Sequence, residues 1–239
     1  MDGLLFSATT AALMVMMING GLGAVGRDSL RRRPVPWAAV GLTALAVAGV
    51  VLQLCWAGAM AALDDDPAKS GWWRVLTSVF MQNGGVFGAL WNIATLAVVA
   101  ALAQWLWGAP LTVLFFVAGI LLPERIDALL GLGGGHSVDP RNFAGSSGAT
   151  YFLGATLAAA LLTRSRTLTG KERALAVGVP VLGLTMWFAQ DNGHGLVAAY
   201  GFALGILMWA VLRRLPRPAP ATCEFRTAAS RRDDARSGA

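Results

Sequence analysis

The stretch GVFGALWNIATLAVVAALAQWLW at residues 85–107 decides the class of protein to which this chain belongs. It contains no charged residue, and a helix needs a run of roughly 20 apolar residues to cross a bilayer. The whole sequence has the same character, because 56% of its 239 residues are hydrophobic, only 13% are charged and the mean hydropathy is +0.58. We therefore expect an integral membrane protein.

Six further apolar stretches predict additional membrane-spanning helices, which makes the expected fold an all-α polytopic bundle. Lipid offers no partners to backbone polar groups, and no alternating pattern of a membrane β-barrel is visible. The shortest stretch, at residues 109–122, is counted as a span because apolar residues flank it on both sides. The predicted spans are Leu4 to Val25, Trp37 to Leu63, Gly85 to Trp107, Ala109 to Leu122, Ser147 to Thr163, Ala174 to Gln190 and His194 to Leu212.

The distribution of Lys and Arg among the loops predicts the orientation, because short cytoplasmic loops carry an excess of these residues. Basic clusters follow the first, fifth and last spans, whereas the loops between them are poorer in bases and contain acidic residues such as Asp64, Asp65 and Asp66. We expect the amino terminus outside and the carboxyl terminus in the cytoplasm. Alanine-rich composition and arginine in preference to lysine indicate a bacterial plasma membrane.

The sequence divides into three parts: a helix and basic cytoplasmic loop at residues 1–36, a membrane core at residues 37–214 and a tail at residues 215–239. The first helix lacks the basic start and the cleavage site of a signal peptide, so we expect it to be retained. In the tail, Pro216, Pro218 and Pro220 prevent helix continuation, and small and charged residues follow. We expect this tail to be disordered and cytoplasmic.

Neither a metal nor a cofactor is indicated. Cys55 lies in the second predicted span and Cys223 in the tail, so the topology separates them, and no metal-ligand spacing is present. The isoelectric point near 10.3 comes from the basic loops and tail, so it does not indicate binding of nucleic acid. We expect no cofactor, no metal, no disulfide and no nucleic-acid partner, and nothing in the sequence indicates an oligomeric state.

Ser147 and His194 begin two predicted spans on the same outer side. A serine hydroxyl becomes a good nucleophile when a base takes its proton, and imidazole, with an ordinary pKa of about 6.5, is suited to that role. Ser147 also lies at a helix start, where unpaired backbone N–H groups can face an oxyanion, and Gly145 and Gly148 allow close approach of backbone. Taken alone, each residue also has a structural explanation, as a small residue at a helix contact or a polar residue at the interface.

The order of several motifs resembles the rhomboid family of intramembrane serine proteases over residues 37–212. The motifs are Trp73-Arg74 before a helix, Asn92 in the following span, Gly145-x-Ser147-Gly148 with Tyr151 four residues later, and His194 at the start of the last span with Gly201 seven residues on. The resemblance implies a six-helix core preceded by one extra helix. It also implies serine endopeptidase activity on membrane-anchored protein substrates.

By this resemblance Ser147 is the nucleophile, His194 is the base, and Tyr151 stacks on the histidine in place of an orienting aspartate. Asn92 and the backbone N–H of Ser147 would hold the oxyanion, with Gly145 and Gly148 in supporting roles. Asp191 and Asn192 lie too near to His194 in sequence to be obvious orienting partners, although one helical turn would permit a contact.

Some positions depart from the family pattern. Gly88 stands where rhomboids usually have a histidine four residues before the asparagine, and the histidines usual after Trp-Arg are absent from the stretch Met81-Gln82-Asn83-Gly84-Gly85. Val197 replaces a glycine at which the last helix would pack on the serine helix, a contact that Gly195 or the pair Gly201 and Gly205 could restore. The alternative hypothesis is therefore an inactive rhomboid-like protein that binds client transmembrane helices. A transporter is disfavoured, because no charged residue lies deep in any span.

Overall fold

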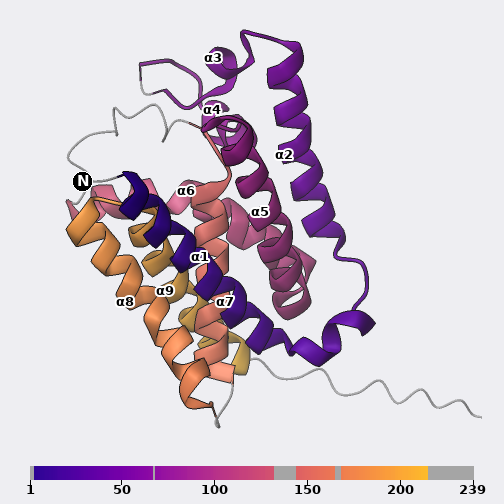
Figure 1. Ribbon diagram of the computed structural model, residues 1–239, viewed down its shortest axis with the longest axis vertical. Helices are drawn as coiled ribbons and strands as arrows, with labels where there is room; N and C mark the ends of the chain where they lie inside the picture. Colours follow the sequence, from indigo (N-terminus) through magenta and orange to yellow (C-terminus); the bar gives the residue numbers. More distant parts are fainter. Residues whose placement is uncertain (1–2, 67, 132–143, 165–167, 215–239) are drawn as a thin grey trace, which may run out of the picture.

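The computed structural model describes residues 3–66, 68–131, 144–164 and 168–214. In this part of the chain all regular structure is helical (Figure 1). The predicted tail, with Cys223, lies outside the described residues. The α-helices are α1 (Gly3–Val25), α2 (Trp37–Cys55), α3 (Ala59–Leu63), α4 (Arg74–Thr77), α5 (Gly85–Trp107), α6 (Ala109–Leu130), α7 (Ser147–Arg164), α8 (Gly170–Gln190) and α9 (Gly193–Arg214), and two 3₁₀ turns are η1 (Arg27–Arg32) and η2 (Ser78–Phe80).

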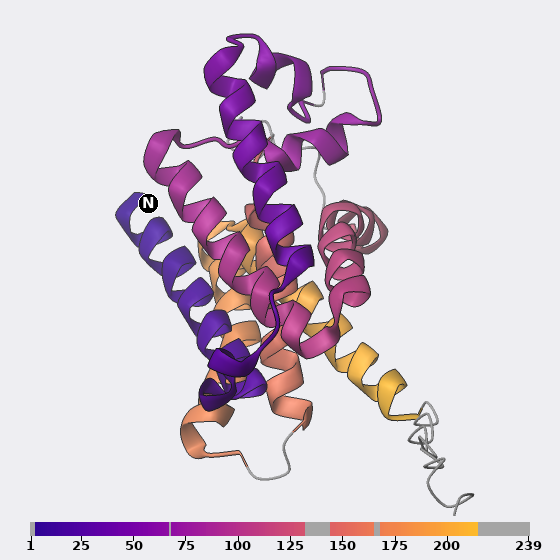
Figure 2. The ribbon, with the colours of Figure 1, turned by 90° about the vertical axis from the view of Figure 1, so that its right-hand side faces the viewer.

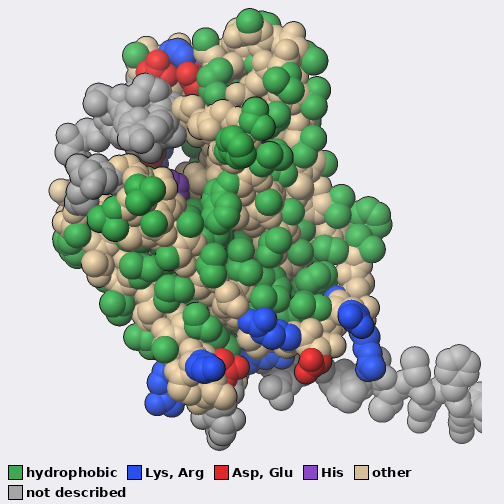
Figure 3. All heavy atoms as spheres, in the orientation of Figure 1, with side chains coloured by type: hydrophobic (Ala, Val, Ile, Leu, Met, Phe, Trp, Pro, Cys, Tyr) green, Lys and Arg blue, Asp and Glu red, His purple; other side chains and the backbone are tan. Residues whose placement is uncertain are grey.

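Among the described residues, five helices are long and apolar enough to cross a membrane: α1, α2, α5, α8 and α9. The expectation of an all-α bundle with transmembrane helices is thus confirmed at this level. The other two long helices, α6 and α7, are not among the five. The seven-span topology and its orientation therefore stay predictions. On the face in Figure 3, charged side chains lie at the two ends of the molecule and a hydrophobic and uncharged band lies between them.

Two predicted spans have different limits in the structure. The span predicted from Trp37 to Leu63 is wrong in its last eight residues, because α2 ends at Cys55, Trp56 is extended (φ −134°, ψ 106°) and the chain resumes as the short α3 after Gly58. Hydrophobicity did not reveal this turn because the residues on both sides of it are apolar. Conversely, α6 continues through Pro123 to Leu130, eight residues beyond the predicted Leu122.

Helix α7 forms the centre of the bundle. All residues from 149 to 161 are buried, and α7 packs against α1, α5, α6, α8 and α9 (Figure 2). Small side chains permit this crowding, since Ala158, Ala159 and Ala160 occupy the middle of the helix. In contrast, α2 packs mainly on α5. The elements that carry the candidate site are therefore all attached to one buried helix.

Two glycines of α9 bring it into close contact with α7. A Cβ added at Gly201 would lie 2.1 Å from the Phe152 carbonyl oxygen, and one at Gly205 would lie 2.8 Å from Ala159 Cβ. Only a residue without a side chain fits at such a crossing. Gly195, by contrast, faces α8, where an added Cβ would lie 2.1 Å from the Gly183 carbonyl oxygen. The close α7–α9 contact is thus made by Gly201 and Gly205, without a glycine at Val197.

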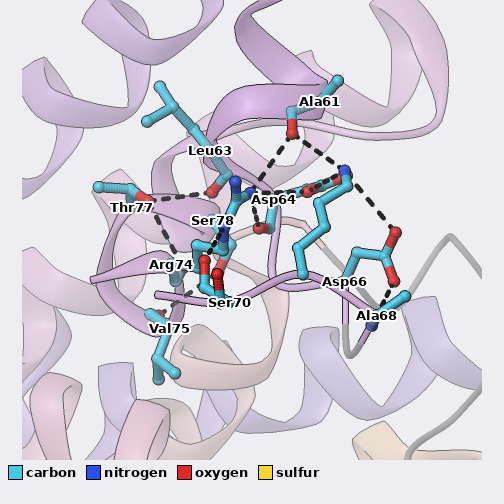
Figure 4. A network of polar contacts seen from close by, with 11 residues as sticks. Ala61, Leu63, Asp64, Asp66, Ala68, Ser70, Arg74, Val75, Thr77 and Ser78 are labelled. Carbon is cyan, nitrogen blue, oxygen red and sulfur yellow. Dashed lines mark hydrogen bonds and ion pairs between the residues drawn. The ribbon is translucent and has the colours of Figure 1, made fainter. Parts of the chain in front are cut away.

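The segment between α2 and α5 is organised around Arg74 (Figure 4). The Arg74 guanidinium donates to the Asp64 backbone oxygen at 3.0 Å and lies 3.3 Å from the Asp64 carboxylate, which Lys69 also contacts at 2.7 Å. Arg74 Nε donates in addition to the Ser70 carbonyl oxygen at 3.1 Å. Planar guanidinium groups suit such multiple contacts. This network fixes the chain just ahead of η2, which in turn contacts the segment leading into α7.

Candidate functional site

His194 lies in the first turn of α9 and is held there by Asn192. Asn192 is fully buried, and its Oδ1 accepts from the His194 backbone N–H at 3.1 Å and lies 3.2 Å from His194 Nδ1. An amide oxygen can only accept a hydrogen bond, so in this contact Nδ1 carries the proton. In the neutral imidazole this leaves Nε2 as the unprotonated nitrogen, which is the form required of a base.

The support of His194 extends to the first helix. Asn192 Nδ2 donates to Thr10 Oγ1 at 2.9 Å, and Thr10 Oγ1 in turn donates to the Phe6 carbonyl oxygen at 2.7 Å. The Tyr151 hydroxyl also donates to the Thr10 carbonyl oxygen at 2.7 Å. Helix α1 is therefore joined by hydrogen bonds to both side chains that touch the imidazole.

Tyr151 joins the start of α7 to the start of α9. Its ring centroid lies 4.8 Å from that of His194, with 62° between the ring planes, and Tyr151 is 1% exposed. Tyr151 is one helical turn after Ser147, so the imidazole stands beside the first turn of α7. At the opposite ends of the same helices Arg213 contacts the Thr163 carbonyl oxygen, which shows that α7 and α9 run parallel.

Ser147 is half-buried and is the first residue of α7. The first hydrogen bond of this helix runs from Thr150 N–H to the Ser146 carbonyl oxygen at 2.9 Å. The N–H groups that precede Thr150 have no carbonyl one turn earlier within the helix, as at every helix start. No described atom lies within 4 Å of a Cβ built at Gly148, so this turn has open space beside Ser147.

The side chains of Ser147 and Asn92 both lie close to Gly145. A Cβ built on Gly145 would have Asn92 Nδ2 at 3.6 Å and Ser147 Oγ at 3.8 Å. Gly145 has φ +128°, a backbone conformation that favours glycine, and its N–H donates to the Ser78 carbonyl oxygen at 3.0 Å. The asparagine amide and the serine hydroxyl therefore lie on either side of a backbone position fixed to η2.

The predicted site residues are thus brought to one end of the bundle. Within the described part of the chain, Ser147 and His194 share no hydrogen bond, and Tyr151, one turn after Ser147, contacts the imidazole. The dyad remains a prediction.

The structure adds three residues that sequence reasoning did not assign to the site: Asn192, Thr10 and Gln82. Asn192 was set aside because it is so near His194 in sequence, yet the turn before α9 lets its side chain reach the ring. Its position just before a helix, where asparagine is a common cap, was an available signal. Thr10 lies far from His194 in sequence, and no sequence signal pointed to it.

The departure at Gly88 also has a structural basis. A Cβ at this position would lie 2.8 Å from the Asn83 carbonyl oxygen, so the local backbone excludes any side chain. A donor from position 88 is therefore absent for a steric reason. The side chain that contacts Asn92 is instead that of Gln82, whose Oε1 accepts from Asn92 Nδ2 at 2.9 Å.

Comparisons of this chain with models of protein families, with curated proteins and with solved structures give no match.

Proposed function

We propose that this protein is an intramembrane serine protease of the rhomboid type, with Ser147 and His194 as its dyad. The observation that carries the proposal is the contact between Tyr151 and His194, one turn from Ser147, combined with the bond from His194 Nδ1 to Asn192. These contacts leave Nε2 of the imidazole as the proton acceptor, close to the start of the serine helix.

In the proposed reaction Ser147 Oγ attacks the carbonyl carbon of the scissile peptide bond while His194 Nε2 takes the hydroxyl proton. Collapse of the tetrahedral intermediate breaks the C–N bond, and the imidazolium gives its proton to the leaving amine. Water then hydrolyses the acyl-enzyme by the same two steps. The Asn92 amide and the N–H groups at the start of α7 would stabilise the oxyanion.

The five apolar helices support transmembrane proteins as substrates, because a site at one end of such a bundle lies within reach of membrane-anchored chains. The outward orientation and the bacterial plasma membrane belong to the same proposal. The orientation rests on the arginine clusters of the loops, and the bacterial membrane rests on the alanine-rich composition with arginine in preference to lysine.

One observation favours the second candidate, an inactive relative that binds client transmembrane helices. Among the described residues Ser147 and His194 share no hydrogen bond, so the nucleophile is not engaged by its base in this state. The protease proposal remains compatible with this state, since catalytic hydrogen bonds are often long or misaligned before substrate binds.

The test is labelling of the purified full-length protein in detergent with a fluorescent fluorophosphonate. We expect the parent protein to be labelled and Ser147→Ala and His194→Ala to lose labelling. Ser146→Ala is the matched control, because Ser146 is the adjacent serine and is fully buried. A folded parent protein that is not labelled would contradict the proposal and favour the client-binding function, to be followed by crosslinking of bound helices.

A further inference from the structure

Gln82 is a buried polar residue whose backbone is fixed independently of its side chain. It follows η2 in the segment before α5 and is 6% exposed. Its backbone N–H donates to Gln53 Oε1 at 2.8 Å, and its carbonyl oxygen accepts from Gln53 Nε2 at 3.0 Å. Both bonds attach this segment to α2. Replacement of the Gln82 side chain therefore leaves its backbone anchors in place.

The side-chain amide of Gln82 has one half paired and the other half unpaired. Gln82 Oε1 accepts from Asn92 Nδ2 at 2.9 Å, whereas Gln82 Nε2 is buried and has no hydrogen-bond partner among the described residues. A buried N–H donor without a partner is unfavourable, and such groups in folded proteins call for an explanation. The two N–H groups of Nε2 are therefore not used by any described residue.

The surroundings of this unpaired donor favour an anionic acceptor. Nε2 belongs to the same planar amide as Oε1, which accepts from Asn92 Nδ2. Asn92 Nδ2 and Ser147 Oγ lie 3.6 Å and 3.8 Å from a Cβ built at Gly145. Asn92 Nδ2 has a second N–H beyond the one that it gives to Gln82. The start of α7 adds backbone N–H groups and the positive end of its helix dipole. The amide nitrogens of Gln82 and Asn92 and the backbone N–H groups of α7 are all donors.

We infer that Gln82 is a further oxyanion donor, acting through Nε2 beside Asn92. This inference rests on the proposed serine protease function. The ligand is the negatively charged oxygen of the tetrahedral intermediate, which forms when Ser147 Oγ has attacked the substrate carbonyl. A donor that is unpaired in the free enzyme and paired in the transition state lowers the barrier, because its interaction is gained only there. Gln82 thus compensates for the donor that the backbone at Gly88 excludes.

Two variants of the full-length protein separate the donor from the rest of the side chain. Gln82→Glu keeps an acceptor for Asn92 Nδ2 and removes the N–H groups, and Gln82→Met removes the polar group at similar length. We expect the rate of fluorophosphonate labelling to fall by roughly 10²-fold in both variants, as for loss of other oxyanion donors. With a cleavable transmembrane peptide the loss should lie in kcat, with KM little changed. Gln190→Met, at the end of α8, is the control and should keep the parent rate.

The midpoint of thermal unfolding in detergent is measured on the same samples. We expect Gln82→Met to unfold close to the parent temperature, because the lost hydrogen bond from Asn92 Nδ2 is offset by no longer burying an unpaired amide N–H group. Labelling of both Gln82 variants at the parent rate would overturn the inference and leave the protease proposal intact. A loss of labelling that comes with an equally large loss of stability in both variants would also overturn it. A parent protein that is not labelled would overturn the protease proposal, and this inference with it.

Discussion

The rings of Tyr151 and His194 meet nearly edge to face, with 4.8 Å between their centroids and 62° between their planes. Aromatic rings prefer this geometry to a face-to-face sandwich. Because the Tyr151 hydroxyl is held by the Thr10 carbonyl oxygen, the ring that supports the imidazole is itself fixed at its far end. The histidine is therefore oriented by a ring on one side and by an amide, Asn192, on its Nδ1 edge.

Substitution of Tyr151 should separate the role of the ring from that of the hydroxyl. Tyr151→Phe keeps the ring contact and loses one hydrogen bond, so we expect about 1 kcal/mol of destabilisation and nearly parental labelling. Tyr151→Leu removes the ring, and labelling should fall more steeply than stability. The labelling rate and the thermal midpoint are compared for both variants. Equal labelling rates in Phe and Leu variants would show that the ring does not orient His194.

Asn192→Ala should slow fluorophosphonate labelling, because His194 Nδ1 loses the acceptor that fixes its tautomer. The loss should be smaller than the roughly 10²–10⁴-fold contribution of a positioned base. Asp191→Asn is the control: Asp191 is exposed and has φ +49°, which asparagine tolerates well. A parental rate in a folded Asn192→Ala protein would remove Asn192 from this role.

Thr10→Val should destabilise the protein, because the buried Asn192 Nδ2 loses its acceptor while the volume of the side chain is retained. The expected cost is about 1–3 kcal/mol, to be measured as a shift in unfolding in detergent. Thr9→Val provides the comparison: Thr9 Oγ1 bonds to Gln190 Oε1, which is only half-buried and can pair with water. The hypothesis fails if the two variants lose the same stability.

Gly201→Ala should push α9 away from α7. The added Cβ would lie 2.1 Å from the Phe152 carbonyl oxygen, and a backbone atom cannot rotate away. We expect a cost of about 1–3 kcal/mol or more, with a loss of labelling as His194 moves from Tyr151. In Gly41→Ala, by contrast, nothing lies within 4 Å of the new Cβ, and the helix gains up to about 1 kcal/mol. Similar thermal midpoints in the two variants would contradict this account.

Local signals in the sequence were sufficient for most helices. The limits predicted for α5, Gly85 and Trp107, agree with the structure, because the stretch carries no charge and glycines with positive φ, Gly84 and Gly108, flank it. The break of α2 at Trp56 was missed, although Gly58, the N-cap of α3, disfavours a helix interior and was a local signal. Proline at position 123 did not end α6, because tertiary packing can outweigh a local preference.

Only those features of the site that follow from the order of motifs along the chain could be predicted from the sequence. Ser147 and His194 begin helices, a feature that hydropathy alone locates. The partners of these residues depend on tertiary contacts that no local pattern encodes: Thr10 lies 182 residues from Asn192, and Gln82 reaches Asn92 from the neighbouring segment. The sequence showed that a donor was absent at Gly88, but the unpaired amide nearby became visible only in three dimensions.

The bonds from Thr10 to Asn192 and Tyr151 also have a consequence for biosynthesis. The ribosome delivers α1 to the membrane first and α9 last, so the histidine acquires its supports only when almost the entire chain has been made. A nascent chain that already exposes Ser147 still lacks an oriented base. Under the proposed protease function, activity would therefore begin only when α9 has joined α1 and α7.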